Sequence, residues 1–128
     1  MLYLDTNVIL RYLLQDHHEF SQKSISIIEN NNVYVKNEVL AEVVYVLNKT
    51  YKVEKQKLRK ILTDFIEVNN IHFESKEIVI LALNIFENQN IDFVDALLCS
   101  YEKLKNFEIV SFDKKLNKCL NNNFNSSL

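Results

Sequence analysis

The sequence contains no glycine, no proline and no tryptophan in its 128 residues. Glycine is the residue that most readily takes a left-handed backbone conformation, so each tight turn in this chain must use another residue. Asparagine is the obvious substitute because it tolerates that conformation. Asparagines cluster where turns are expected, at 30–32, 69–70, 88, 90 and 121–123. We therefore expect asparagine to replace glycine at the turns.

The chain also lacks a strong excess of charge of either sign. Its net charge is −2 and its pI is about 5.9, which exclude a general basic field around the molecule. If the partner is nucleic acid, the attraction must come from local lysines or from a bound metal ion. The hydrophobic content of 48% is ordinary for a globular protein. We expect a single domain covering residues 1–128, which buries roughly two-thirds of its unfolded surface.

Cysteines and long apolar runs are scarce. Cys99 and Cys119 form no CxxC pattern, and their simplest interpretation is buried or inert thiols in a reducing cytosol. The N-terminus has no basic region and Asp5 interrupts its apolar stretch, so no signal peptide is expected. The longest apolar runs, 78–83 and 43–47, are too short to span a bilayer. These features predict a cytoplasmic protein without membrane contact.

Short apolar runs alternate with helical patterns along the whole chain. The helical patterns place apolar residues at i, i+3, i+4 and i+7, as Leu40, Val43, Val44 and Leu47 do. Alternation of strands and helices indicates an α/β fold with a parallel sheet of four to five short strands, covered by helices on both faces. Strands are expected at 2–4, 33–35, 71–73 and 108–112, and helices at 8–14, about 20–28, 37–48, 54–68, 75–87, 92–105 and from 114.

Carboxylates stand at conspicuous places in this layout. Asp5 and Asp113 each end an expected strand, while Glu42 and Asp95 lie on the flank of the apolar stripe of their helices. Several carboxylates brought together repel one another, so protonation or a divalent cation is needed to hold them. Hard oxygen ligands without cysteine or histidine favour Mg²⁺ or Mn²⁺ over zinc. Such a site suits metal-assisted phosphodiester cleavage, with one ion or a pair.

Each acid also has a structural interpretation. Glu42 alone is typical of a solvated helix face, and Asp92 with Asp95 resembles a capping pair at spacing i, i+3. Asp113 could cap the last helix. Asp5 is the hardest to explain structurally, because a carboxylate directly after an apolar strand is costly to place there.

The combination of motifs resembles a PIN-domain ribonuclease, and more narrowly a VapC-type toxin of a toxin–antitoxin pair. The resemblance extends over essentially the whole chain. The segments that carry it are Asp5-Thr6-Asn7-Val8-Ile9-Leu10-Arg11, Leu40-Ala41-Glu42-Val43-Val44-Tyr45-Val46-Leu47, Asp92-Phe93-Val94-Asp95-Ala96-Leu97-Leu98 and Ser111-Phe112-Asp113.

This resemblance implies a three-layer PIN-like fold and an endoribonuclease that depends on Mg²⁺ or Mn²⁺. It also implies inhibition by a cognate antitoxin protein, and homodimers are common in such proteins. The acids implied to be catalytic and to bind the metal are Asp5, Glu42, Asp95 and Asp113. The residues implied to support them are Thr6, Asn7, Ser111, whose hydroxyl would help to orient the first aspartate, and Asp92, as either a helix cap or an outer acid. Arg11, on the helix that follows Asp5, is a candidate for contact with RNA or with a partner.

Three other interpretations compete with the toxin. A PIN-domain nuclease in RNA processing would act without an antitoxin. A phosphoacceptor receiver domain would need an acidic pair at its first strand and a late lysine before proline, and this chain has neither. A PIN-like binding module without activity would be expected to have lost one of the four acids, and all four are present.

Overall fold

The computed structural model describes residues 1–121, and the chain divides into two compact units. The first unit is Met1–Lys76, and the second begins at Glu77. Each unit is described by itself. No helix in the described part of the chain is both long enough and apolar enough to cross a membrane. The prediction of one domain over residues 1–128 stays a prediction.

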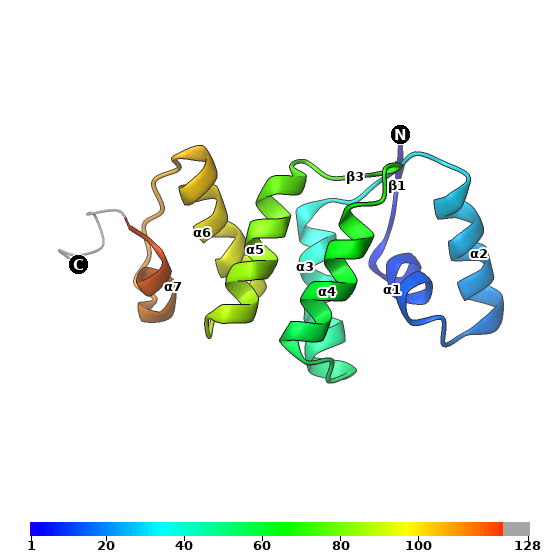
Figure 1. Cartoon of the computed structure of the whole chain (residues 1–128), viewed down its shortest axis with the longest axis horizontal. Helices are drawn as coiled ribbons and strands as arrows, with labels where there is room; N and C mark the ends of the chain where they lie inside the picture. The colour runs from blue at the N-terminus through cyan, green and yellow to red at the C-terminus, as the bar shows by residue number, and fades with distance from the viewer. Residues whose placement is uncertain (122–128) are drawn as a thin grey trace. The chain divides into compact units, whose positions relative to one another are not determined.

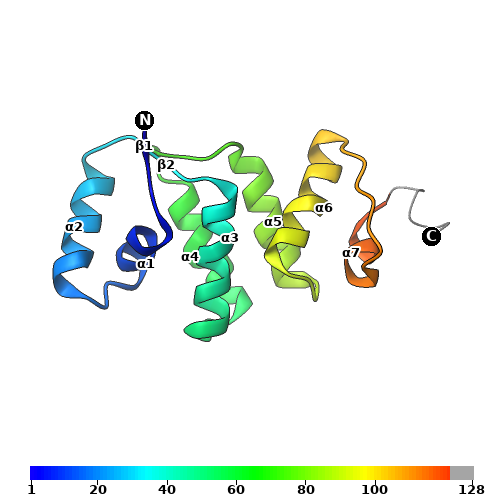
Figure 2. The same cartoon turned by 180° about the vertical axis from the view of Figure 1, so that it is seen from behind.

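The elements follow the predicted alternation closely at the helices and less closely at the strands (Figures 1 and 2). The first unit contains β1 (Leu2–Tyr3), α1 (Thr6–Leu14), α2 (His18–Glu29), β2 (Val33–Tyr34), α3 (Asn37–Tyr45), the π-helical turn η1 (Val46–Thr50), α4 (Lys55–Ile66) and β3 (Ile71–His72). Helix α5 (Lys76–Asn88) starts at the last residue of that unit, and α6 (Phe93–Lys105) and α7 (Lys114–Cys119) complete the second.

The sheet of the first unit is parallel, with strand order β1-β2-β3. Val33 pairs with Leu2 on one side and with Ile71 on the other. Val33 and Ile71 are fully buried, so these residues belong to the core. In both views α2 lies on one side of the strands, and α3 and α4 lie on the other. The chain is therefore a mostly helical α/β protein with a parallel sheet, as predicted.

The expected sheet of four to five strands is not observed, because residues 1–121 contain three. Segment 108–112, expected as a strand, has neither helix nor strand. Val110 and Phe112 are 60% and 85% exposed. Their side chains lack the burial that makes an apolar run favourable as a strand, and this segment forms no ladder in the described residues.

The turns of this glycine-free chain use asparagine in the left-handed conformation less often than the sequence suggested. Over the described range, the residues with left-handed backbone are Gln15, Lys52 and Asn106, with φ of 51°, 57° and 58°. Gln15 ends α1 and Asn106 ends α6. The asparagines at 30–32 and 69–70 lie at turns as expected, but with φ outside the left-handed region. Among residues 1–121, asparagine replaces glycine in the left-handed conformation at Asn106 alone, and the predicted turn asparagines at 122 and 123 lie outside the described residues.

The second unit has a helical core and a covalent link. Ile78, Leu83 and Ala96 are fully buried, and the buried Ser100 hydroxyl donates a hydrogen bond to the carbonyl of Ile78 at 2.8 Å. A disulfide joins Cys99 on α6 to Cys119 at the end of α7, with 6.2 Å between their Cα atoms.

The prediction that Cys99 and Cys119 are thiols is therefore wrong, although both residues are buried as expected. Among the residues that the structure describes, no cysteine is free. The spacing of twenty residues along the chain carries no information about their distance in space. It is the packing of α7 on α6 that brings the two Cα atoms within the usual range for a disulfide.

Candidate active site: two groups of carboxylates

The first group of candidate residues surrounds the start of α1. Asp5 follows β1 after one intervening residue and is the N-cap of α1, where its Oδ1 accepts a hydrogen bond from the backbone N–H of Thr6 at 2.8 Å. The buried Thr6 hydroxyl donates to Oε2 of Glu42 at 3.1 Å. A carboxylate on α3 is thereby tied to the residue that follows Asp5. Both carboxylates remain exposed.

The Thr6–Glu42 hydrogen bond was not expected from the sequence, because 36 positions separate the two residues. The spacing placed Glu42 on the flank of its helix, which agrees with its exposure beside the buried Val43. The sequence does show that Thr6 is unusual, because it lies between Asp5 and Asn7 and precedes an apolar run. This pattern draws attention to the hydroxyl of Thr6, but it does not reveal which residue accepts its hydrogen bond.

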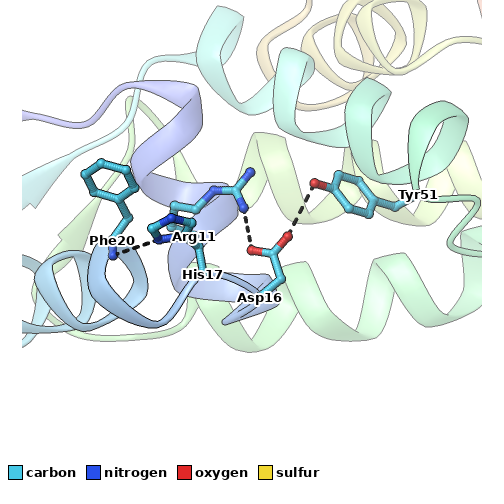
Figure 3. A network of polar contacts seen from close by, with 5 residues as sticks. All are labelled: Arg11, Asp16, His17, Phe20 and Tyr51. Carbon is cyan, nitrogen blue, oxygen red and sulfur yellow. Dashed lines mark hydrogen bonds and ion pairs between the residues drawn. The ribbon is translucent and has the colours of Figure 1, made fainter.

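Arg11 lies on the same helix and belongs to a polar network (Figure 3). Its guanidinium forms an ion pair with Asp16, and the Tyr51 hydroxyl donates to the other oxygen of that carboxylate at 3.5 Å. The pKa of Arg11 is raised, first by its hydrogen bond with Tyr51 and then by Asp16, while burial acts in the opposite direction. Arg11 thus stays cationic. It also lines a hollow of about 540 Å³ between α1 and α2, together with Asn7 and Phe20.

The second group of candidate residues lies in the second unit. Asp95 is in the first turn of α6 and Asp92 is at its N-cap position, although the Asp92 side chain makes no capping hydrogen bond. The pKa of Asp95 is raised, chiefly because burial removes water from its carboxyl, and further because the negative charges of Asp113 and Asp92 act on it. Asp113 and Asp92 therefore each lie close enough to Asp95 for their charges to act on its carboxyl.

Asp113 caps α7. Its Oδ1 accepts hydrogen bonds from the backbone N–H groups of Lys115 and Leu116 at 2.8 and 3.2 Å. The Ser111 hydroxyl in turn accepts from the backbone N–H of Asp113 at 2.9 Å, and so shapes the loop that presents this acid. The prediction that Asp113 ends a strand is wrong, because residues 108–112 form none. Its structural role as a helix cap is confirmed, and a role in a metal site stays a prediction.

The donor sets fit a hard divalent cation in type and charge. All are carboxylate oxygens, and the repulsion felt by Asp95 is the kind that a cation relieves. Over residues 1–121, no group of three or more aspartate, glutamate, histidine or cysteine side chains is arranged to hold a metal ion. Asp5 with Glu42, and Asp95 with Asp113 and Asp92, form two partial sets. Whether the two sets meet stays a prediction, as does the action of Ser111 on Asp5.

The comparisons with known proteins give one match. The family model of the PIN domain matches residues 2–119, which is nearly the whole chain. No curated protein and no solved structure matches. The matched range includes every acid of both groups.

Proposed function

Because this chain belongs to the PIN domain family, we propose that it is an endoribonuclease that hydrolyses RNA phosphodiester bonds with the help of Mg²⁺ or Mn²⁺. PIN domains are typically nucleases, so the family itself supports a hydrolase acting on nucleic acid. The observation that carries the finer proposal is the repulsion that Asp113 and Asp92 exert on Asp95, which adds to the larger effect of burial in raising the pKa of its carboxyl. Such repulsion is unfavourable in the protein alone, and a bound cation offsets it.

In this proposal Asp5, Glu42, Asp95 and Asp113 hold the ion or ions. The chemistry supplied by a bound ion is activation of a water and stabilisation of charge on the phosphate. Thr6 positions Glu42, because its hydroxyl donates to one carboxylate oxygen and leaves the other for the metal. Asp5 is fixed at the start of α1 by its capping hydrogen bond. Asn7 and Asp92 support the site at its edge.

We further propose that the chain is the toxin of a toxin–antitoxin pair, held inactive by a cognate antitoxin and acting as a homodimer in the cytoplasm. The motif combination around Asp5, Glu42, Asp95 and Asp113 supports this proposal. Nuclease action in RNA processing without an antitoxin is the alternative. A small reading frame for a DNA-binding protein directly upstream of this gene favours the toxin, and a neighbourhood without one favours the alternative.

The nuclease proposal is tested by cleavage of RNA with purified protein in Mg²⁺ or Mn²⁺, with and without reductant because of the disulfide. We expect a chelator to stop cleavage. Asp5→Asn and Asp95→Asn each lower the rate at least about a hundredfold, since each removes charge needed in the transition state. The matched control is Asp64→Asn, on an exposed position of α4. Full cleavage by both site variants contradicts the proposal.

A further inference from the structure

A second, smaller hollow lies entirely within the second unit. It has a volume of about 280 Å³ and lies between the turn that joins α5 to α6 and the helix α7. The residues lining it are Gln89, Asn90, Ile91, Lys115 and Lys118. We call it the lysine pocket. It contains two cations, two side-chain amides and one apolar residue, and no carboxylate of residues 1–121 lines it.

The two lysines of the pocket are available for a ligand. They stand at spacing i, i+3 on α7 and therefore share one face of that helix. Both are exposed, and neither ammonium has an ion pair or hydrogen bond to any residue in the range 1–121. Lys103 differs, because its ammonium donates to the carbonyl of Cys119 at 3.1 Å. Two unpaired cations beside one hollow attract an anion.

The amides add directional contacts to this charge. The side chains of Gln89 and Asn90 each carry an NH₂ group that can donate to an anionic oxygen. Ile91 is 6% exposed and gives the pocket a fixed apolar wall. Ammonium and amide donors without a competing carboxylate suit a phosphate group. A volume of about 280 Å³ leaves room for part of the attached sugar.

The segments that form the lysine pocket also carry the acids of the second unit. Asp92 follows Ile91 directly, and Asp113 lies two residues before Lys115. Acidic and basic residues are thus close in sequence on the same two segments. An RNA strand that is cleaved beside the acids must pass its neighbouring phosphates over adjacent protein surface.

We propose that the lysine pocket binds a phosphodiester group of the RNA strand, next to the phosphodiester that is cleaved. This inference rests on the proposed ribonuclease function and adds to it a substrate-binding subsite. The net charge of −2 makes such a local site important, because the molecule as a whole does not attract RNA. Each lysine that contacts a phosphate releases a counterion and makes binding more sensitive to salt.

The test is the salt dependence of RNA binding, measured by fluorescence anisotropy on the whole chain in the presence of chelator. A short labelled single-stranded RNA is titrated between about 50 and 200 mM salt. We expect Lys115→Gln and Lys118→Gln each to reduce the slope of log K against log salt by about 0.7. Lys114→Gln is the matched control on the same helix, because Lys114 does not line the pocket, and it leaves the slope unchanged.

A second arm uses inorganic phosphate to separate the two sources of this ligand chemistry. If phosphate raises the melting temperature of the wild type and the RNA slopes do not change in either variant, the pocket binds a free anion and the proposal is overturned. Equal slopes in all four proteins overturn it too, as does an equal reduction in Lys114→Gln. The proposal is also overturned if an acidic protein partner requires both lysines for binding and RNA binding requires neither.

The proposal for the lysine pocket and the proposal of nuclease activity can be contradicted independently of each other. Metal-dependent cleavage with unchanged slopes contradicts the pocket and leaves the enzyme. Reduced slopes in a protein that cleaves no RNA contradict the enzyme and retain the RNA-binding subsite.

Discussion

Asp5 and Glu42 of the first unit and Asp95 of the second have different surroundings, whereas Asp113 caps its helix much as Asp5 does. In the first unit, Asp5 and Glu42 each accept a hydrogen bond, from the backbone and the hydroxyl of Thr6. In the second, Asp95 is partly buried and faces the charges of Asp113 and Asp92. Hydrogen bonds fix the orientation of a carboxylate, whereas burial and like charge raise the pKa of Asp95. The first group is thus pre-positioned, and the second is where a cation has the larger electrostatic effect.

The largest expected difference between the units concerns the disulfide, which lies within the second. Replacing both Cys99 and Cys119 by alanine should lower stability by about 3 kcal/mol, since the bridge closes a loop of twenty residues in the unfolded chain. Native-state hydrogen exchange measures this locally. We expect faster exchange at the core amide of Leu97 and little change at Leu62 in the first unit. Equal exchange at Leu97 in both proteins contradicts this expectation.

Metal binding gives the next largest effect. Mg²⁺ at about ten times its Kd should raise the free energy of unfolding by about 1.4 kcal/mol, because the ion binds the native state only. Thermal melting with and without chelator measures the shift. The Asp5→Asn, Asp95→Asn double variant should show no shift, and Asp64→Asn should behave as the wild type does. An equal shift in the double variant excludes these carboxylates as the ligands.

A third prediction concerns the hydrogen bond from the Thr6 hydroxyl to Glu42 in the first group. Thr6→Val keeps the shape of the side chain but removes the donor to Glu42, and should cost about 1 kcal/mol in urea unfolding. Cleavage should fall severalfold as well, because Glu42 loses its fixed orientation. Thr6→Ser, which retains the hydroxyl, is the control and should recover most of the rate. If Thr6→Val cleaves RNA at the wild-type rate, the hydroxyl of Thr6 contributes to stability only and does not position Glu42 for cleavage.

The smallest effect concerns the charge on Asp95. Its pKa is raised in the folded protein by burial, by Asp113 and by Asp92, so its ionised form opposes folding at neutral pH. That unfavourable contribution is absent below the unfolded pKa and grows as pH rises through the folded pKa. Asp95→Asn should therefore stabilise the metal-free protein at pH 7. At pH about 3 the difference should vanish. Urea unfolding at both values measures it, and destabilisation at pH 7 contradicts the account of Asp95.

The sequence predicted the helices well because their apolar residues repeat with helical period. Leu40, Val43 and Val44 identified α3, and the cap position of Asp92 located the start of α6 within one residue. The strand at 108–112 was mispredicted, since a short apolar run becomes a strand only when another strand pairs with it. No strand among residues 1–121 pairs with this segment, and its Val110 and Phe112 are exposed.

The candidate site was predictable as residue types but not as contacts. The carboxylate of Asp5 after an apolar strand is a local pattern that the sequence displays directly. The hydrogen bond from Thr6 to Glu42 and the bridge from Cys99 to Cys119 depend on packing between distant segments, and neither spacing encodes them. The lysines of α7 were overlooked because lysine is frequent throughout the chain.

In the proposed nuclease, Asp5 and Glu42 of the first unit and Asp95 and Asp113 of the second bind the ion or ions together, and paramagnetic Mn²⁺ can test this proposal. A bound Mn²⁺ broadens the NMR signals of nearby amides. We expect the amides of Thr6 in the first unit and Asp95 in the second to broaden together at one Mn²⁺ concentration, and we expect Asp95→Asn to abolish both effects. Broadening confined to one unit, or unchanged broadening at Thr6 in that variant, would contradict a shared site.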